Sequence, residues 1–288
     1  MNMEKFLHPD RVGIGSLTIE NPKIKKELPF DAERDITEED YQAMLGKIKR
    51  ERESSVWLNF SFSVMRMKIL FPQRQADLKL DDQAWKGMRD DLQLWREKSD
   101  WWRFHHLAMN MKLLFPQRQS ELGLNEEDWQ RMHKQLEEER NKRNKYGWRG
   151  FSELAMLLGV LFPQRQAELG LNEEAWQGMK KALDEYRSTS DWVNASIFSD
   201  IAMQMKILFP QRQADIGLTE EDWQEMYKLL LRGRVNKQGE SVKQSMIMQI
   251  LVAEEAYIND QGEIVINMRK DKVDLHQETP PMPVVRRF

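Results

Sequence analysis

The pentapeptide FPQRQ occurs four times in this chain, and its spacing decides the fold. Successive copies begin 44, 47 and 47 residues apart. This period is typical of helical repeats such as armadillo and HEAT units, which are about 40–47 residues long. Polar surface residues are usually free to vary, so the repeated Gln-Arg-Gln needs a reason. The copies are Phe71–Gln75, Phe115–Gln119, Phe162–Gln166 and Phe209–Gln213.

A helix is predicted after each copy. A Trp follows each motif Phe by 14 residues, a Met follows the Trp by three, and a Leu follows the Met by four. Steps of three and four residues mark one face of a helix. Four residues before each Trp stands a residue suited to cap the helix N-terminus. These caps are Asp81, Asn125, Asn172 and Thr219.

A second helix is predicted before each copy, from apolar residues eleven, seven and four positions ahead of the motif Phe. Between the two helices the motif Pro is placed to open a short helix. Gly123, Gly170 and Gly217 are placed to close it as left-handed residues, and Lys79 departs from this pattern in the first unit. Each unit is therefore predicted to contain a long helix, a short helix and a long helix.

The fold predicted from these units is all-α: an armadillo/HEAT-like, right-handed α-solenoid of four full three-helix repeats with half-repeat caps. The stretches ITEEDYQAM and MQILVAEEAY match parts of a unit, so we expect them to form the atypical ends that a solenoid needs. The expected parts are an N-terminal extension (1–35), a half-unit (36–53), repeats 54–97, 98–143, 144–187 and 188–235, and a C-terminal cap (236–258), the solenoid as a whole being 36–258.

The C-terminal segment 259–288 does not follow the repeat pattern. INDQGEIVINM is consistent with a short hairpin around Asp260 to Gly262. The following ETPPMPVVRRF is Pro-rich and is expected to be extended or disordered. Its terminal Phe288 suggests a segment that docks onto another protein or another copy of the chain.

Composition bounds the class of protein. The 288 residues are 40% apolar and 32% charged, and the net charge of −3 points to no nucleic acid or anionic membrane as a partner. There is no cysteine, which excludes disulfides and fits a reducing compartment. No signal peptide and no apolar run of about 20 residues is visible. We expect a cytoplasmic protein.

Catalytic signals are weak. The five histidines are scattered, and the chain lacks HExxH, GxSxG, a Gly-rich phosphate loop and a Cys nucleophile. The carboxylates occur mainly as pairs at helix starts, where capping explains them. We therefore expect no enzyme, no cofactor and no metal site.

Two rows of arginine recur with the units. The first is the Arg of FPQRQ, which has an acid three residues later, at a spacing that permits an ion pair. The second row of arginines falls eleven residues after each Trp, or after the Tyr in the Trp position of the half-unit, near the end of the second helix. Three interpretations remain open: a network that fixes the stacking of units, a groove for an acidic or phosphorylated ligand, and recent duplication. The second row is Arg52, Arg96, Arg140, Arg187 and Arg234.

The motif residues are the candidate partner-binding site. The favoured partner is a protein or peptide, with no membrane. A nucleic acid at the Arg rows or at the basic stretch RNKRNKYGWRG is the alternative, and self-association through the tail stays open. The candidates are Gln73, Arg74, Gln75, Gln117, Arg118, Gln119, Gln164, Arg165, Gln166, Gln211, Arg212, Gln213 and Phe288.

The units of the type LFPQRQxELGLNEEDWQxM resemble those of uncharacterised bacterial helical-repeat proteins, over residues 36–258. The resemblance implies the repeat architecture and adds no site. The sequence thus predicts a non-catalytic scaffold or adaptor that presents a long surface to a protein or peptide, with a nucleic-acid-associated protein as the alternative and an enzyme as the third reading.

Overall fold

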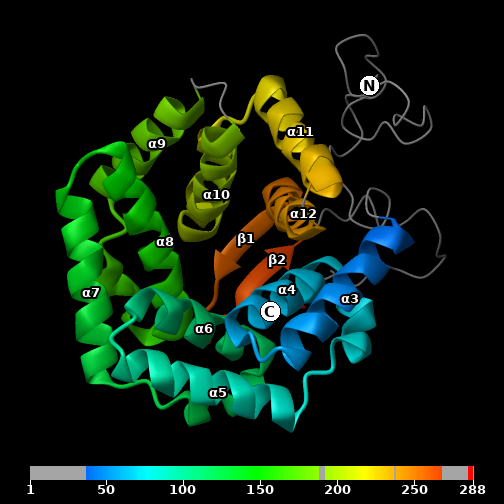
Figure 1. The fold of residues 1–288 in the computed structure, drawn as a ribbon. Helices are drawn as coiled ribbons and strands as arrows, with labels where there is room; N and C mark the ends of the chain where they lie inside the picture. Colours follow the sequence, from blue (N-terminus) through cyan, green and yellow to red (C-terminus); the bar gives the residue numbers. More distant parts are fainter. Residues whose placement is uncertain (1–36, 188–191, 237, 268–284, 288) are drawn as a thin grey trace.

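The computed structural model describes residues 37–187, 192–236, 238–267 and 285–287. Most of these residues are helical, as the sequence predicts, and the long helices alternate between an outer and an inner layer (Figure 1). The outer helices are α3 (Glu38–Glu53), α5 (Asp82–Glu97), α7 (Glu126–Asn141), α9 (Glu173–Arg187) and α11 (Glu220–Asn236). The inner helices are α4 (Trp57–Leu70), α6 (Trp101–Leu114), α8 (Lys145–Leu161), α10 (Trp192–Leu208) and α12 (Gln238–Val252).

The inner helices are buried on nearly all sides because they pack against each other and against the outer layer. The phenylalanines expected on their core face (Phe60, Phe104, Phe151 and Phe198) are all buried. The Trp and Met of the outer helices, such as Trp129 and Met132, lie in the same core. Full burial of one such large side chain stabilises the fold by about 1.5–3 kcal/mol, so the repeated stripes account for one continuous core.

The sequence predicts two solvated solenoid ends, but in the structure the two ends meet. Each inner helix packs against the next, and α12 packs against α4, so the five inner helices close a ring (Figure 1). α12 also contacts α3. The half-units at the two ends therefore cover each other.

Short 3-10 helices join inner to outer helices at the FPQRQ motifs. In each one Pro occupies the first turn and the residue after the last Leu or Ile has a left-handed backbone. Lys79 adopts this conformation too, with φ 49°, although the other three units use Gly there. The short helices are η4 (Pro72–Leu78), η5 (Pro116–Leu122), η6 (Pro163–Leu169) and η7 (Pro210–Ile216).

The outer helices begin where the sequence places their caps. Asp81, Asn125 and Asn172 each accept a hydrogen bond from the backbone N–H three residues ahead, as does the hydroxyl of Thr219. Substitution of such a cap by Ala typically costs about 1 kcal/mol. The basic stretch Arg140–Gly150 is largely helical rather than a solvated loop, since α7 ends at Asn141 and α8 begins at Lys145.

A small antiparallel sheet follows α12 and lies inside the ring (Figure 1). β1 (Glu255–Ile258) pairs with β2 (Ile264–Asn267), and β3 (Val285–Arg287) pairs with the other edge of β2. The hairpin turns at residues 259–263, where the sequence suggests one. The sequence predicts a helical cap up to residue 258, but residues 255–258 form a strand, because this last unit lacks the Phe-Pro corner that starts a 3-10 helix.

Candidate functional site

The corner formed by FPQRQ has the same geometry in every unit. The Phe ends the inner helix with a non-helical backbone, and the Arg two residues after the Pro donates its N–H to the Phe carbonyl. The Phe ring meets, edge to face, the aromatic ring of the preceding outer helix, as in Trp129–Phe162 at 5.3 Å between centroids. The corner therefore joins one unit to the unit before it.

The motif arginines extend this junction. Arg165 Nη2 donates to Glu168 in its own 3-10 helix at 2.7 Å, and Arg165 Nη1 donates to Glu126 of α7 at 2.8 Å. Its guanidinium also lies over the ring of Trp129. Arg74, Arg118 and Arg212 make the equivalent contacts to Glu38, Asp82 and Glu173 and to the aromatic ring of the preceding outer helix.

The second arginine row points the other way, to the following unit. Arg96 Nη2 donates to the Gly123 carbonyl at 3.1 Å and to the buried carboxylate of Asp128 at 2.7 Å. Arg187 does the same with Gly217 and Asp222. Arg52 and Arg140 bind the start of the next outer helix in a related way. The side chain of Arg234 lies outside the described part of the chain. Both rows contact carboxylates, and both link adjacent units.

The two glutamines of each motif have different surroundings. The first one (Gln117, Gln164 or Gln211) is exposed, and the side chain of Gln73 is outside the described residues. Gln164 also lines a groove between η5 and η6. The second one contacts the hairpin in the third and fourth units. Gln213 Nε2 donates to the Ala256 carbonyl of β1 at 3.0 Å, and Gln166 Nε2 donates to the Asn259 carbonyl at 3.3 Å.

The second glutamines of the first two units have no such strand before them. Among the described residues, neither Gln75 nor Gln119 has a side-chain hydrogen bond. Gln119 lines a groove of about 780 Å³ between η5 and η6, which the hairpin closes at one end with Gln261 and Glu263. The candidate partner-binding residues thus separate into three sets. The motif arginines contact the preceding unit and the first glutamines are exposed. Of the second glutamines, Gln166 and Gln213 bind the hairpin, whereas Gln75 and Gln119 have no side-chain hydrogen bond among the described residues. Phe288 lies outside the described residues.

A row of buried lysines lies beside this groove. Lys68 donates to the Leu113 carbonyl at 2.8 Å, and Lys206 donates to the Leu251 carbonyl at 2.7 Å, so that each caps the end of the next inner helix. Lys112 lines the groove, and burial lowers its pKa to about 8, although the nearby Glu263 acts in the opposite direction. No sequence pattern singles out this row, because a Lys near the end of a helix is usually solvated.

The third unit breaks the lysine row, and the hairpin explains why. Gly159 stands where the other units have Lys, and a Cβ there would lie 3.0 Å from Ile258 Cδ1. At the turn, Gly262 has φ +76°, and a Cβ on it would lie 2.2 Å from the Val160 carbonyl oxygen. The ring and the hairpin are therefore fitted to each other, a relation that no local pattern in the sequence reveals.

Comparison with models of protein families, with curated proteins and with solved structures finds no match. Within the described ranges no helix has the length and apolar character to cross a bilayer. No group of three or more His, Cys, Asp or Glu side chains suited to a metal ion is found in the same part of the chain. The groove instead offers amide donors, an ammonium group and a strand end, a combination that suits the polar main chain of a peptide.

Proposed function

We propose that the protein is a non-catalytic helical-repeat scaffold that binds an extended segment of a protein partner on the inner side of its corners. The observation that carries the proposal is the pair of bonds from Gln166 and Gln213 to the main chain of the hairpin. The same amide stands free in the first two units, at Gln75 and Gln119. An amide that holds one extended chain in units three and four is suited to hold another in units one and two.

The spacing of the occupied positions defines what such a segment looks like. The carbonyls bound by Gln213 and Gln166 belong to Ala256 and Asn259, which are three residues apart. Three extended residues cover about 10 Å, close to the distance of about 8–10 Å between packed helices. A partner segment running in the direction of β1 would therefore place one carbonyl on Gln119 and a second, three residues later, on Gln75.

The nucleic-acid alternative rests on the arginine rows, and their contacts weigh against it. Each described guanidinium of both rows contacts a carboxylate of a neighbouring helix or of its own corner. Phosphate binding would require these pairs to break. It also predicts an affinity that falls steeply between 50 and 200 mM salt, roughly 10³–10⁵-fold for six to ten phosphate contacts.

Self-association through the tail is a separate proposal. In this chain β3 pairs with β2, so residues 285–287 already serve as an added strand in cis. Two copies that exchanged this strand would form a dimer. Deletion of residues 277–288 that left the oligomeric state and the recovered partners unchanged would count against it.

A selection experiment tests the scaffold proposal. Random 12-residue peptides displayed on phage are selected on the full chain, and the affinity of enriched peptides is measured by calorimetry. Each lost hydrogen bond costs about 0.5–1.5 kcal/mol, so Gln119→Ala should weaken binding up to about tenfold and Gln75→Ala/Gln119→Ala should weaken it further. Gln117→Ala, one corner position away on the outer surface, is the matched control. Equal effects of Gln117→Ala and Gln119→Ala would reject the proposed site.

A further inference from the structure

A ladder of buried polar contacts runs between the inner helices. Asn110 Nδ2 on α6 donates to Ser61 Oγ on α4 at 2.9 Å. Ser152 Oγ on α8 donates to Gln204 Oε1 on α10 at 2.5 Å. Gln244 Nε2 on α12 reaches Ser199 Oγ on α10 at 3.3 Å. A serine hydroxyl and a side-chain amide thus share one hydrogen bond at each of three junctions of the ring.

The junction between α6 and α8 lacks this contact. Its positions equivalent to the Ser and the amide are occupied by His105 and Leu157. His105 is 2% exposed, and its Nε2 has no hydrogen-bond partner among the described residues. Burial lowers the pKa of His105 to about 3, with the neighbouring His106 acting in the same direction, so this imidazole is neutral near pH 7. Unsatisfied buried polar atoms are uncommon in folded proteins and often mark a ligand or water site.

A cavity of about 170 Å³ opens at this same junction, between α6, α7 and α8, and both His105 and Leu157 line it. Three further acceptors border the cavity: Gln135 and Glu139 from α7, and Glu153 from α8. Gly150 contributes room, because a Cβ on it would lie 2.7 Å from Glu139 Oε2. No Lys or Arg lines the cavity itself, and Lys142 Nζ donates to only one oxygen of Glu139, Oε1, at 2.5 Å.

His106 and Glu153 hold one wall of the cavity in place. His106 Nε2 lies 2.9 Å from Glu153 Oε1, while its Nδ1 is buried without a partner. Burial acts to raise the pKa of Glu153, but the hydrogen bond with His106 and the charges of His106, Arg149 and Lys243 together outweigh it, and the pKa is lowered. The carboxylate is therefore ionised at neutral pH and gives the cavity a negative wall.

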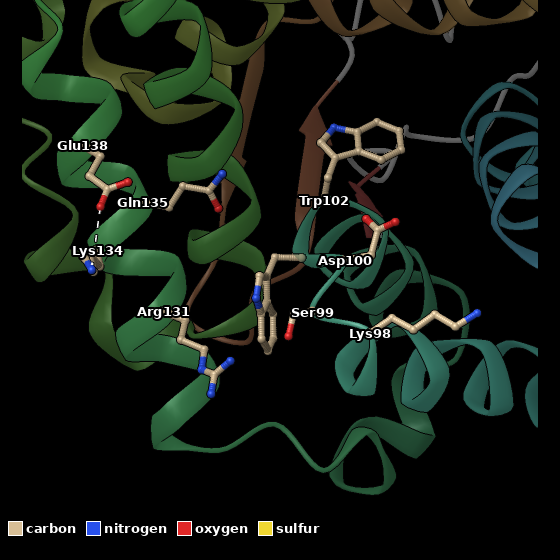
Figure 2. A pocket seen from close by; sticks show the side chains of 9 residues that line it. Lys98, Ser99, Asp100, Trp102, Arg131, Lys134, Gln135 and Glu138 are labelled. Carbon is tan, nitrogen blue, oxygen red and sulfur yellow. Dashed lines mark ion pairs between the residues drawn. The ribbon is translucent and has the colours of Figure 1, made fainter.

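Trp102 forms the outer wall. Its side chain is 56% exposed, an unusual state for a Trp, and its ring centroid lies 4.6 Å from that of His106. Trp102 and Gln135 also border a shallow groove between α6 and α7 (Figure 2). In that view they extend from the two facing helices, and both residues also line the cavity.

We propose that this cavity binds a guanidinium group, held by the carboxylates of Glu139 and Glu153, by His105 Nε2 and by the face of Trp102. A guanidinium has five N–H donors in one plane and stacks on aromatic rings, which matches several acceptors beside an indole. The group belongs either to a small free cation or to an arginine side chain of a partner. This inference does not depend on the peptide groove, which lies at the opposite ends of the inner helices.

Nuclear magnetic resonance of the histidine rings tests the proposal in the full chain. The chain has five histidines, so the signals of His105 and His106 can be assigned with single His→Gln variants. Methylguanidinium should shift both signals with saturation at about 0.1–10 mM, a range suited to so small a ligand. The signals of His8, His133 and His276 should not move. Methylurea, which has the same shape without the charge, should bind at least tenfold more weakly. Equal binding of the two probes, or no saturable shift, would overturn the proposal.

Two variants separate loss of the site from loss of the fold. His105→Ser/Leu157→Gln rebuilds the Ser–Gln contact found between α8 and α10, so it should fold, fill the cavity and abolish the shift of the His106 signal. Trp102→Ala changes an exposed residue and should weaken methylguanidinium binding about five- to thirtyfold. Unchanged binding in the double variant, with folding confirmed by circular dichroism, would also overturn the proposal.

A third comparison decides whether the guanidinium belongs to a free cation or to an arginine side chain. If the cavity takes an arginine side chain, the peptide Ac-Gly-Arg-Gly-NH2 binds at least as tightly as methylguanidinium. If it takes a free cation, the peptide binds more weakly because its backbone meets the cavity rim. Both results support guanidinium recognition, whereas failure of both ligands contradicts it.

Discussion

The side chain of Gln213 donates to the carbonyls of both Lys206 and Ala256, so one amide joins an inner helix to the strand that occupies the ring. The last residue of FPQRQ therefore holds the hairpin in this unit, a role that the exposed first glutamine of the motif does not have. Where the strand does not reach, at Gln75 and Gln119, the same amide has no hydrogen bond within the described part of the chain.

Gln213→Ala should loosen the hairpin without unfolding the ring. It removes a bond to β1 worth about 0.5–1.5 kcal/mol, so hydrogen exchange of the amides in the β1–β2 ladder should accelerate roughly 2- to 13-fold. Gln211→Ala, on the outside of the same corner, should leave these rates unchanged. Equal exchange in both variants would show that the Gln213 bond does not hold the strand.

Arg96→Ala should destabilise the fold because it strands a buried carboxylate. The side chain of Asp128 is 3% exposed and would lose its only guanidinium contact, at a cost of about 1–3 kcal/mol in the free energy of unfolding. Arg165→Ala should also lower the melting temperature, but by less, since Glu126 and Glu168 remain exposed to water. Urea denaturation of the two variants checks the order, and a larger loss in Arg165→Ala would contradict it.

Lys79→Gly should stabilise the protein. Lys79 has a left-handed backbone at the position where the other three units have Gly. Relief of this conformation should raise the free energy of unfolding by about 0.5–1 kcal/mol, net of the greater freedom of Gly in the unfolded chain. Gly123→Lys is the reverse change at an equivalent site, where a new Cβ would meet nothing within 4 Å, and should lower it by a similar amount. Loss of stability in Lys79→Gly would show that its side chain has a role of its own.

His105 should make the fold sensitive to acid. Its pKa is about 3 in the folded chain and about 6.5 when unfolded, so the unfolded state binds more protons between these values. The free energy of unfolding should therefore fall by up to about 1.4 kcal/mol per pH unit as the pH drops from 6.5 towards 3. His105→Ser/Leu157→Gln should show a shallower slope in denaturation curves recorded at pH 7, 6, 5 and 4. Parallel slopes would mean that the imidazole is not held neutral.

Much of the helical architecture could be predicted because the same pattern of caps and apolar residues recurs in every unit. The spacing of Trp129 and Met132, the cap at Asn125 and the Pro of the corner each identify the same helix boundaries as their counterparts in other units. Local physics determines these features, so one sequence is enough. The ion pair of each motif Arg with the acid three residues later follows from helical spacing in the same way.

Other features depend on contacts between distant parts of the chain. Closure of the ring requires α12 to meet α4, and no periodicity encodes whether the two ends of a repeat array touch. The sequence of β1 aligns with an FPQRQ corner and therefore predicts a helical cap, whereas its pairing with the distant β2 makes it a strand. The break in the Ser–amide ladder at His105 is visible in the sequence only when the positions that face each other across two helices are known.

The side-chain amide signals of the motif glutamines show directly whether a partner segment binds at Gln75 and Gln119. The full chain is labelled with 15N-glutamine, and a peptide selected for binding is added to saturation. We predict shifts of the Gln75 and Gln119 side-chain amides, with nuclear Overhauser contacts from them to the peptide main chain, and unchanged signals for the exposed Gln117 and Gln211. Shifts confined to Gln117 and Gln211 would place the binding surface on the outside of the corners and contradict the proposed site.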